Sequence, residues 1–265
     1  MTVLGIIGWP LEMTLSPKLH EYLFKITSIS GQYDKLPIEK INDLALKELM
    51  RKYIGINVTI PHKQSVYREL KDISNSSKSV EATQVVNTIV KSEEAISLHN
   101  TDYKGFLAEI SRLNYKLKNK TILILGRGGS SKSIQYALQD LNTTEIYVVS
   151  RTPQNHQLDY ADIDSVSDEI DMIINTTPLG MPPYQNQSPI EESIKFNNLE
   201  IVLDIGYNNK ESKFMKQFKN VEVANGLGML IAQGIESFNL WTKSKLSFTD
   251  LYKEIKELLE EEIHD

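Results

Sequence analysis

One segment limits the possible folds more than any other: Thr121-Ile122-Leu123-Ile124-Leu125, an apolar run followed directly by a glycine-rich stretch. Such a continuous run is typical of a strand that is buried on both faces in the centre of a parallel sheet. Parallel strands need crossover connections, and the helical pattern of Ser130–Leu141 supplies one before a second strand at Ile146–Ser150. The segment therefore predicts an α/β fold with a parallel sheet in this half of the chain.

The N-terminal part of the chain shows its own alternation of strand and helix. We expect a helix to open at Ser16-Pro17, with serine as N-cap and proline at the first helical position. The remaining elements predicted before residue 120 are strands at Val3–Gly8, Gln32–Leu36 and Ile54–Ile60, helices at Asn42–Lys52 and Asp102–Leu113, and a hairpin of Val85–Lys91 with Ala95–His99. This order predicts a first α/β unit with a mostly parallel sheet.

The C-terminal part adds two strands and two helices. Met172–Asn175 and Ile201–Ile205 are predicted strands, and Met229–Thr242 carries a helical apolar stripe. A last amphipathic helix is predicted to begin at Thr249, with its apolar side chains on one face. We interpret both helices as packing elements.

Length and composition exclude several classes of protein. A chain of 265 residues with 40% hydrophobic and 24% charged residues predicts two folded domains. A net charge of −6 gives no electrostatic footprint for nucleic acid. The absence of cysteine excludes disulfides, thiolate zinc sites and cysteine nucleophiles, and we expect no metal. The apolar start, Met1–Pro10, is too short for a signal or a membrane span, so we expect a cytoplasmic protein without a membrane partner.

The predicted strand Ile54–Ile60 carries polar side chains on one face and is followed by a lysine. With a side-chain period of two, Ile56, Val58 and Ile60 face one way. Asn57 and Thr59 face the other way, and Lys63 follows just past the strand. The pattern is that of a strand that holds a small polar molecule; the alternative is an edge strand with a surface lysine.

The glycine-rich stretch occupies the place of a dinucleotide pyrophosphate loop. Gly126, Gly128 and Gly129 permit a tight turn and close approach of the backbone, and the following helix offers free N–H groups. The pattern departs from G-x-G-x-x-G at Ser131. Strand, loop and helix in this order predict a nucleotide site.

The end of the next strand indicates which dinucleotide is bound. Loops that bind NAD place a carboxylate here for the ribose, whereas this chain has Ser150-Arg151-Thr152. An arginine between two hydroxyls suits a 2′-phosphate, so NADP is favoured over NAD. The alternative is an ordinary surface arginine.

Taken together, these residues resemble the shikimate dehydrogenase family over nearly the whole chain. The matching stretches, in order and at family spacing, are Gly8-x-Pro10, Thr14-Leu15-Ser16-Pro17-x-x-His20, Asn57-Val58-Thr59-Ile60-Pro61-His62-Lys63, Val86-Asn87-Thr88, Asn100-Thr101-Asp102, Gly126-x-Gly128-Gly129, Ser150-Arg151-Thr152, Ile174-Asn175-Thr176-Thr177-Pro178-Leu179-Gly180-Met181, Asp204-x-x-Tyr207 and Asn225-Gly226-Leu227-Gly228-Met229-Leu230-x-x-Gln233.

The resemblance implies NADPH-dependent reduction of 3-dehydroshikimate to shikimate, a step in aromatic amino acid biosynthesis. It implies a substrate domain of residues 1–103 plus 232–265 and a Rossmann-like NADP-binding domain of residues 104–231, with the active-site cleft between them. We expect a monomer or a homodimer. A quinate/shikimate dehydrogenase that uses NAD, and a non-catalytic nucleotide-binding sensor, are the alternatives.

Carried over from the family, the catalytic pair is Lys63 and Asp102, and His62 is a bystander. The predicted substrate ligands are Thr14, Ser16, Asn57, Thr59, Asn87, Asp102, Tyr207 and Gln233. The predicted cofactor contacts are Gly126, Arg127, Gly128, Gly129, Ser130, Ser150, Arg151, Thr152, Thr176, Gly226 and Met229. Four departures from the family matter. Thr14 replaces the usual serine, Tyr103-Lys104 replaces a pair of small residues after the aspartate, and Asn209 replaces the usual proline. No second basic residue follows Arg151, which predicts a weaker preference for NADP over NAD.

Overall fold

The computed structural model describes residues 1–139, 141–208 and 210–263, which form two compact units. Unit 1 comprises Met1–Glu109 and Leu230–Glu262, and unit 2 comprises Ile110–Met229 with Ile263. Both main boundaries lie inside helices, a few residues from the domain limits predicted at 103/104 and 231/232. The assignment of substrate to one domain and of nucleotide to the other stays a prediction.

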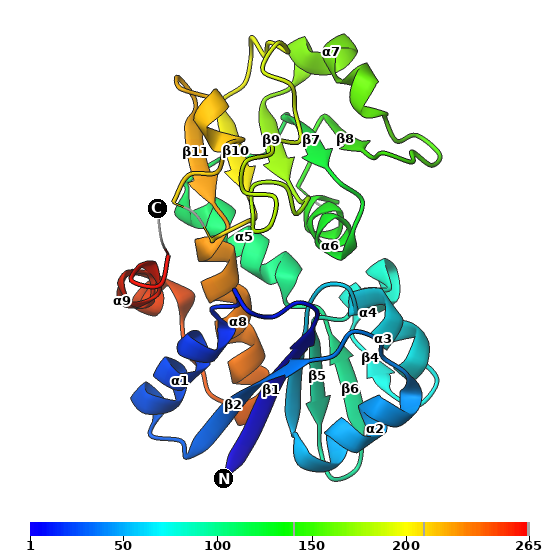
Figure 1. Ribbon diagram of the computed structural model, residues 1–265, viewed down its shortest axis with the longest axis vertical. Coiled ribbons are helices and arrows are strands. Elements are labelled where there is room, and N and C mark those ends of the chain that lie inside the picture. Colours follow the sequence, from blue (N-terminus) through cyan, green and yellow to red (C-terminus); the bar gives the residue numbers. More distant parts are fainter. Residues whose placement is uncertain (140, 209, 264–265) are drawn as a thin grey trace. The chain divides into compact units, whose positions relative to one another are not determined.

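Unit 1 is built on a mixed sheet (Figure 1). Its described strands are β1 (Thr2–Gly8), β2 (Gly31–Pro37), β3 (Gly55–Val58), β4 (Asn75–Ser76), β5 (Thr88–Lys91) and β6 (Ile96–His99), in the spatial order β2-β1-β3-β5-β6-β4. The β1–β2, β1–β3 and β4–β6 pairs are parallel, whereas β3–β5 and β5–β6 are antiparallel. The mostly parallel sheet and the hairpin are therefore confirmed.

Helices cover both faces of this sheet. Ile56 and Val58 of β3 join a core with Met50 of α2 (Asp43–Lys52) and Val66 of α3 (Lys63–Leu70). The opposite face meets α1 (Ser16–Thr27) and α8 (Leu227–Thr242), where Gly55 packs so closely on Trp241 that no Cβ would fit. The remaining helices with residues in this unit are α4 (Lys78–Thr83), α9 (Phe248–Glu260) and the first turns of α5 (Asp102–Arg112).

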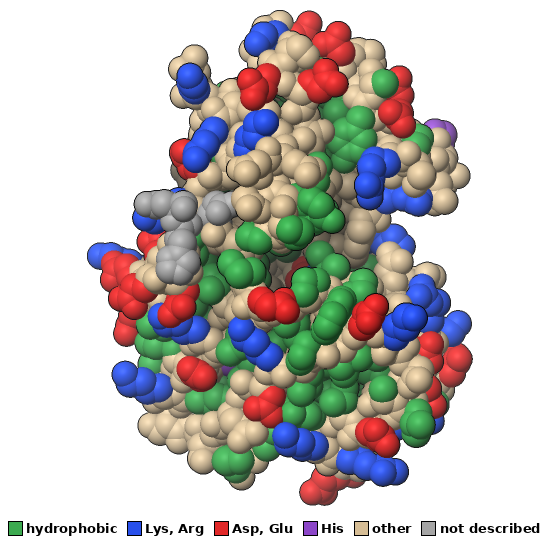
Figure 2. Space-filling model, in the orientation of Figure 1, with side chains coloured by type: hydrophobic (Ala, Val, Ile, Leu, Met, Phe, Trp, Pro, Cys, Tyr) green, Lys and Arg blue, Asp and Glu red, His purple; other side chains and the backbone are tan. Residues whose placement is uncertain are grey.

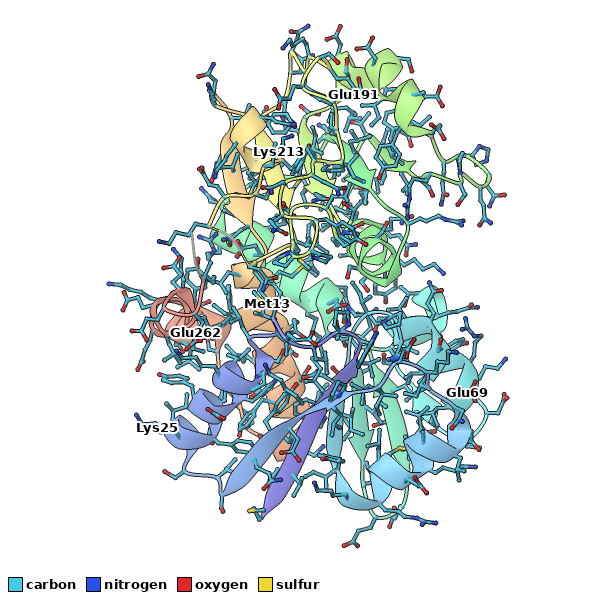
Figure 3. All side chains as sticks on the ribbon, in the orientation of Figure 1. Met13, Lys25, Glu69, Glu191, Lys213 and Glu262 are labelled. Atoms are coloured by element: carbon cyan, nitrogen blue, oxygen red, sulfur yellow. The ribbon has the colours of Figure 1, made fainter. Side chains whose placement is uncertain are left out.

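Helix ends follow capping chemistry in some places and depart from it in others. Asn42 caps α2, because its Oδ1 accepts a hydrogen bond from Ala45 N at 2.9 Å. The predicted cap at Ser16 is wrong: Leu15 holds the N-cap position and Ser16 is the first helical residue. The start predicted at Thr249 is also displaced, since Ser247 holds the N-cap position of α9. Lys18 of α1 donates to Glu262, just beyond the end of α9, at 2.7 Å; Figure 3 labels Glu262.

Ile60 also departs from prediction. It was expected to share the buried side of its strand with Ile56 and Val58, but it is 57% exposed. The strand ends at Val58, and the backbone then turns, with His62 N donating to the Thr59 carbonyl at 2.9 Å. The alternation of faces therefore stops two residues earlier than the apolar pattern indicates.

Unit 2 carries a sheet in which every pair of described strands is parallel. Its strands are β7 (Thr121–Leu125), β8 (Glu145–Val149), β9 (Met172–Asn175), β10 (Ile201–Asp204) and β11 (Glu222–Asn225), in the order β11-β10-β9-β7-β8. Its helices include α6 (Gly129–Leu138), α7 (Ile163–Val166) and short 3-10 turns at Tyr160–Asp162, Ser167–Glu169 and Met215–Gln217. This doubly wound order confirms the Rossmann-like prediction and places a topological switch point between β7 and β9.

Lys/Arg and Asp/Glu side chains are interspersed on the face shown in Figure 2. Of the helices that the structure describes, none combines the length and the apolar character that a membrane crossing requires.

Candidate active site

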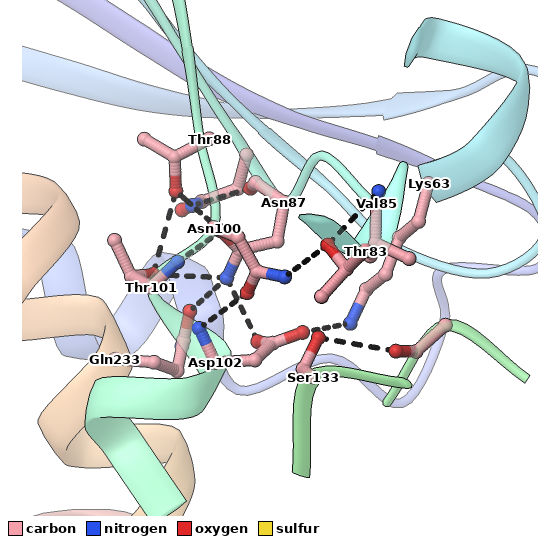
Figure 4. Close-up of polar contacts among 12 residues, drawn as sticks. Lys63, Thr83, Val85, Asn87, Thr88, Asn100, Thr101, Asp102, Ser133 and Gln233 are labelled. Carbon is pink, nitrogen blue, oxygen red and sulfur yellow. Dashed lines mark hydrogen bonds and ion pairs between the residues drawn. The ribbon is translucent and has the colours of Figure 1, made fainter. Parts of the chain in front are cut away.

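The centre of the candidate site is the ion pair between Lys63 and Asp102. Lys63 Nζ donates to Asp102 Oδ2 at 2.6 Å, and the two side chains are only 13% and 7% exposed (Figure 4). Lys63 opens α3 just after β3, and Asp102 opens α5 just after β6. Because β3 and β6 are each antiparallel to β5, they run in the same direction and end at the same edge of the sheet. The fold therefore joins two residues that are 39 positions apart in the sequence.

Asn87 holds the aspartate from the other side. It lies just before β5, at this same edge, and its Nδ2 donates to Asp102 Oδ1 at 2.8 Å. Its Oδ1 accepts from the backbone N of Thr101 at 2.7 Å, which fixes the orientation of the amide. Gln233 on α8 adds a longer contact, with its Oε1 3.4 Å from Asn87 Nδ2. The two oxygens of Asp102 therefore have different partners, one a lysine and the other an amide.

Asn57 lies behind this group and is fully engaged with the protein. Its side chain belongs to a residue that is 5% exposed, and Tyr33 donates to its Oδ1 at 2.6 Å. Its Nδ2 lies 3.1 to 3.2 Å from the Asn87 carbonyl, Thr88 Oγ1 and Ser237 Oγ. An amide has two N–H donors and one oxygen, so these partners occupy the donors and one side of the oxygen.

Thr14, on the loop between β1 and α1, and Ser16, the first residue of α1, form a second polar group; the same loop carries Met13 (Figure 3). Thr14 Oγ1 donates to Ser16 Oγ at 3.2 Å. Thr59 is half-buried and touches Gly8 at the end of β1, leaving no space there for a Cβ. Tyr207 is half-buried after β10 in unit 2, and its predicted substrate contact stays a prediction.

His62, adjacent to the lysine, is turned away into main-chain contact. Its residue is 3% exposed, and its Nε2 lies 2.5 Å from the Ile38 carbonyl oxygen. A carbonyl only accepts, so this nitrogen is the donor. The imidazole thus has a local structural partner.

In unit 2, the glycine loop has the geometry that a phosphate site requires. Gly126 has φ +98°, and a Cβ there would lie 2.8 Å from Thr176 Oγ1. Gly128 is the N-cap of α6, and a Cβ there would meet nothing within 4 Å. The first N–H groups of α6 therefore border open space at the switch point of the sheet. Ser131, which breaks the glycine pattern, is fully buried.

The other predicted cofactor residues border this loop or lie at neighbouring strand ends. Arg127 donates to Thr152 Oγ1 at 2.9 Å, joining the loops that follow β7 and β8. Ser150 is buried, and Arg151 is exposed beside it. Thr176 donates to the Leu125 carbonyl at 2.7 Å. Gly226 follows β11 and packs against the Ile205 backbone, where no Cβ would fit, and Met229 in the first turn of α8 is buried.

Sequence reasoning missed four polar side chains that support the two amides behind the Lys63–Asp102 pair. Tyr33, Thr88, Thr101 and Ser237 all lie in the hydrogen-bonded group around Asn57 and Asn87. The motifs contain Thr88 and Thr101 but indicate no role for them. The available signal for Ser237 is its spacing, one helical turn after Gln233 on α8, which places both on one face.

Comparisons with known proteins agree with the motifs. The model of the shikimate dehydrogenase substrate binding domain matches residues 6–89, and that of the shikimate 5'-dehydrogenase C-terminal domain matches residues 226–255. A shikimate dehydrogenase (NADP(+)) from Clostridium beijerinckii is 35% identical over 257 residues, which cover 93% of this chain and 94% of that relative. The chain belongs to the shikimate dehydrogenase family. The resemblance drawn from the motifs is thereby confirmed.

Two further members of the shikimate dehydrogenase family show how far the likeness extends. A shikimate dehydrogenase (NADP(+)) from Clostridium botulinum is 36% identical, with 91% of this chain and 96% of the relative covered. The crystal structure of shikimate dehydrogenase 1 from Peptoclostridium difficile superposes with a TM-score of 0.88 at 31% identity, over 100% of both chains. The likeness thus includes both units.

Proposed function

We propose that this chain catalyses the reversible NADP-dependent reduction of 3-dehydroshikimate to shikimate. The observation that carries the proposal is the buried Lys63–Asp102 pair, held by Asn87 at the carboxyl edge of the unit 1 sheet. Membership of the family supports the same reaction. An ion pair with 13% and 7% exposed side chains is expensive to bury, and a catalytic role accounts for that expense.

NADPH, when bound, supplies the hydride that reduces the substrate carbonyl carbon. The carbonyl oxygen then gains negative charge and must take up a proton. The Lys63 ammonium stabilises this charge and donates the proton, and in the reverse reaction the lysine takes the proton back. Asp102 orients the ammonium through the 2.6 Å bond and accepts a hydrogen bond from a neighbouring substrate hydroxyl.

The remaining polar groups divide into direct and indirect contacts. Thr14 and Ser16 bind the substrate carboxylate through their hydroxyls, and Thr59, Asn87 and Gln233 bind ring hydroxyls; a contact from Tyr207 is part of the same prediction. Asn57 is also a predicted ring-hydroxyl ligand. Like the amide of Asn87, its amide is already bonded to protein partners, so both amides also support the site. A polyol requires many matched partners, since an unmatched buried polar group costs affinity.

The unit 2 loop fits a dinucleotide. The open space beside Gly128, the backbone donors of α6 and the two arginines of this edge suit a pyrophosphate and a 2′-phosphate. Gly126 and Thr176 shape the loop, while Arg127 and Arg151 supply positive charge. We assign NADP to these residues, together with the other cofactor contacts predicted from the family.

A pair of glycine variants tests the loop. Gly128→Ala is expected to leave the thermal unfolding temperature unchanged, because its Cβ meets no protein atom within 4 Å, yet to weaken NADP binding about tenfold or more. Gly126→Ala is expected to lower both the unfolding temperature and the affinity for NADP, because it places a side chain on a residue with a left-handed φ of +98°. Isothermal titration with NADP and a thermal melt measure the two effects. Unchanged NADP affinity in Gly128→Ala would contradict the assignment of the pyrophosphate to this loop.

The proposed function is tested by comparing oxidation rates for two substrates with two cofactors. Purified protein is assayed with shikimate and with quinate, each with NADP and with NAD, at the nicotinamide absorbance band. We expect NADP-linked shikimate oxidation to be fastest. Faster NAD-linked quinate oxidation would favour a quinate/shikimate dehydrogenase, and no turnover with nucleotide binding intact would favour a sensor.

We further propose that the protein works in the cytoplasm, with a small molecule as its partner and neither nucleic acid nor membrane bound. A monomer or a homodimer is expected, and light scattering after size-exclusion chromatography distinguishes the two.

A further inference from the structure

Ser237 is a buried hydroxyl at the centre of the polar group in unit 1. It lies on α8, is 0% exposed, and its Oγ donates to the Gln233 carbonyl at 3.0 Å. The same oxygen is 3.1 Å from Asn57 Nδ2, 2.8 Å from Thr88 Oγ1 and 3.1 Å from Thr101 Oγ1. Four elements of the fold therefore meet at one serine that belongs to none of the motifs.

Two of these partners control Asn87. Thr88 Oγ1 donates to Asn87 Oδ1 at 3.0 Å, beside the bond from Thr101 N at 2.7 Å. With its oxygen held by two donors, the amide must turn its NH2 group toward Thr101 Oγ1 at 2.9 Å and Asp102 Oδ1 at 2.8 Å. A flipped amide would place its oxygen against the carboxylate, which would repel it.

Ser237 in turn restrains the hydroxyls that hold this amide. The Thr88 hydrogen goes to Asn87, so the Ser237 hydroxyl hydrogen is shared between the Gln233 carbonyl and Thr88 Oγ1. Ser237 Oγ accepts from Asn57 and from Thr101, whose oxygen is 3.5 Å from that of Thr88. The hydroxyl cluster, defined as Thr88, Thr101 and Ser237, is buried with at most 1% exposure, so water cannot replace a lost member cheaply.

We propose that Ser237 is a positioning residue for catalysis: through the hydroxyl cluster it fixes the amide of Asn87 and thereby the carboxylate of Asp102. This inference rests on the proposed function, since Asp102 takes part in catalysis only if the chain catalyses the proposed reaction. Ser237 itself touches neither Lys63 nor Asp102. Its role is to hold α8 in register with the edge where β3, β5 and β6 present the site.

The test compares two variants of α8, each of which replaces a hydroxyl-bearing residue with alanine. Ser237→Ala is expected to lower kcat for shikimate oxidation about tenfold, with KM for NADP within about twofold of the wild type. Thr242→Ala is the matched control, because Thr242 Oγ1 also donates to a carbonyl four residues back, that of Phe238, at 2.8 Å. Its kcat is expected to match the wild type. Thr88→Val, which preserves side-chain shape, provides a second deletion in the cluster should Ser237→Ala fold poorly.

A double-mutant comparison separates positioning from general packing. In an Asp102→Asn background, Ser237→Ala is expected to lower kcat by less than about twofold, because the group it positions has been altered. An undiminished tenfold loss there, or a wild-type kcat in both Ser237→Ala and Thr88→Val, would overturn the proposal.

A readout without turnover distinguishes failure of this inference from failure of the proposed function. The carboxyl carbon of Asp102, labelled with ¹³C, is expected to change its chemical shift in Ser237→Ala and not in Thr242→Ala. A wild-type protein inactive on shikimate would refute the function. An unmoved Asp102 resonance in Ser237→Ala would refute the positioning.

Discussion

Lys63→Ala is expected to lower kcat for shikimate oxidation by about 10²- to 10⁴-fold while NADP binding persists. The ammonium is the one positive group bonded to Asp102 within the described site, and its Nζ is 2.6 Å from the carboxylate. Its removal deletes both the proton donor and the charge that stabilises the alkoxide. Steady-state rates and isothermal titration with NADP, whose predicted contacts lie in unit 2, measure the two parts separately.

Two comparison variants make this result interpretable. Lys18→Ala removes another ion-paired lysine, bonded to Glu262 at 2.7 Å, and is expected to leave kcat unchanged. Lys63→Arg keeps the positive charge but cannot give up a proton at accessible pH. Loss of activity in Lys63→Arg comparable to that in Lys63→Ala would assign proton transfer to the lysine, whereas full activity would assign charge stabilisation alone. Near-normal turnover in Lys63→Ala would refute the catalytic role altogether.

The fold was predictable wherever a local pattern determines the structure. The run Thr121–Leu125 is β7 to the residue, because a strand buried on both faces excludes polar side chains along its length. Gly126 was equally readable, since its φ of +98° and the approach of Thr176 both require glycine. By contrast, β11 at Glu222–Asn225 lies at the edge of its sheet, where a short strand needs no long apolar run, and it was not predicted.

The errors arose where tertiary contacts replace a local preference. Ser16 has the residue type of an N-cap, yet its hydroxyl pairs with Thr14 and Leu15 takes the cap position. Ile60 continues an apolar alternation in sequence, but the chain turns after Val58 and leaves it exposed. In both cases the path of the chain after the strand end, and not the preference of the residue itself, determines where the residue lies.

The catalytic pair of the candidate site was predictable from the sequence, but the residues that support the pair were not. Lys63 and Asp102 stand in short motifs, so they were recognisable before their bond was seen. Ser237 stands in a helix with no motif of its own, and only the packing of α8 against β3 and β5 brings it to Asn57 and Thr88. Supporting residues of this kind depend on which elements pack together, and a single sequence does not contain that information.

Acidification is expected to weaken unit 1 well before it weakens unit 2, because of a buried histidine. His20 is 0% exposed, and neither ring nitrogen has a hydrogen-bond partner among residues 1–139, 141–208 and 210–263. Its ring stacks on Tyr33 with centroids 4.2 Å apart and lies 5.4 Å from Trp241. Burial lowers the pKa of His20 from 6.5 to about 3, an effect that the Asn57 side chain partly opposes.

The sign follows from proton binding. Between pH 6.5 and about 3 the unfolded chain binds a proton at His20 that the folded chain does not. The stabilisation is therefore complete above pH 6.5 and is lost as the pH falls toward 3, by as much as about 5 kcal/mol. Asp204 in unit 2 acts in the opposite direction, because burial raises the pKa of its carboxyl from 3.8 to about 6 against bonds from Ser212, Gly206 and Asn175. In that interval the folded form binds more protons, so acid favours unit 2.

The prediction is checked by measuring amide hydrogen exchange from pH 7 to pH 4, corrected for intrinsic exchange rates. Hydrogen exchange reports on each unit separately, which is needed because the two units need not unfold together. Protection of amides in α1 is expected to fall steeply below pH 6.5, while protection in β10 is retained. His20→Phe keeps the aromatic stack and removes the titrating group, so it is expected to flatten the pH dependence of α1. His156→Gln, at an exposed position after β8, is the control and is expected to change neither unit. If α1 in His20→Phe loses protection in parallel with the wild type, the acid sensitivity lies elsewhere and the buried histidine does not cause it.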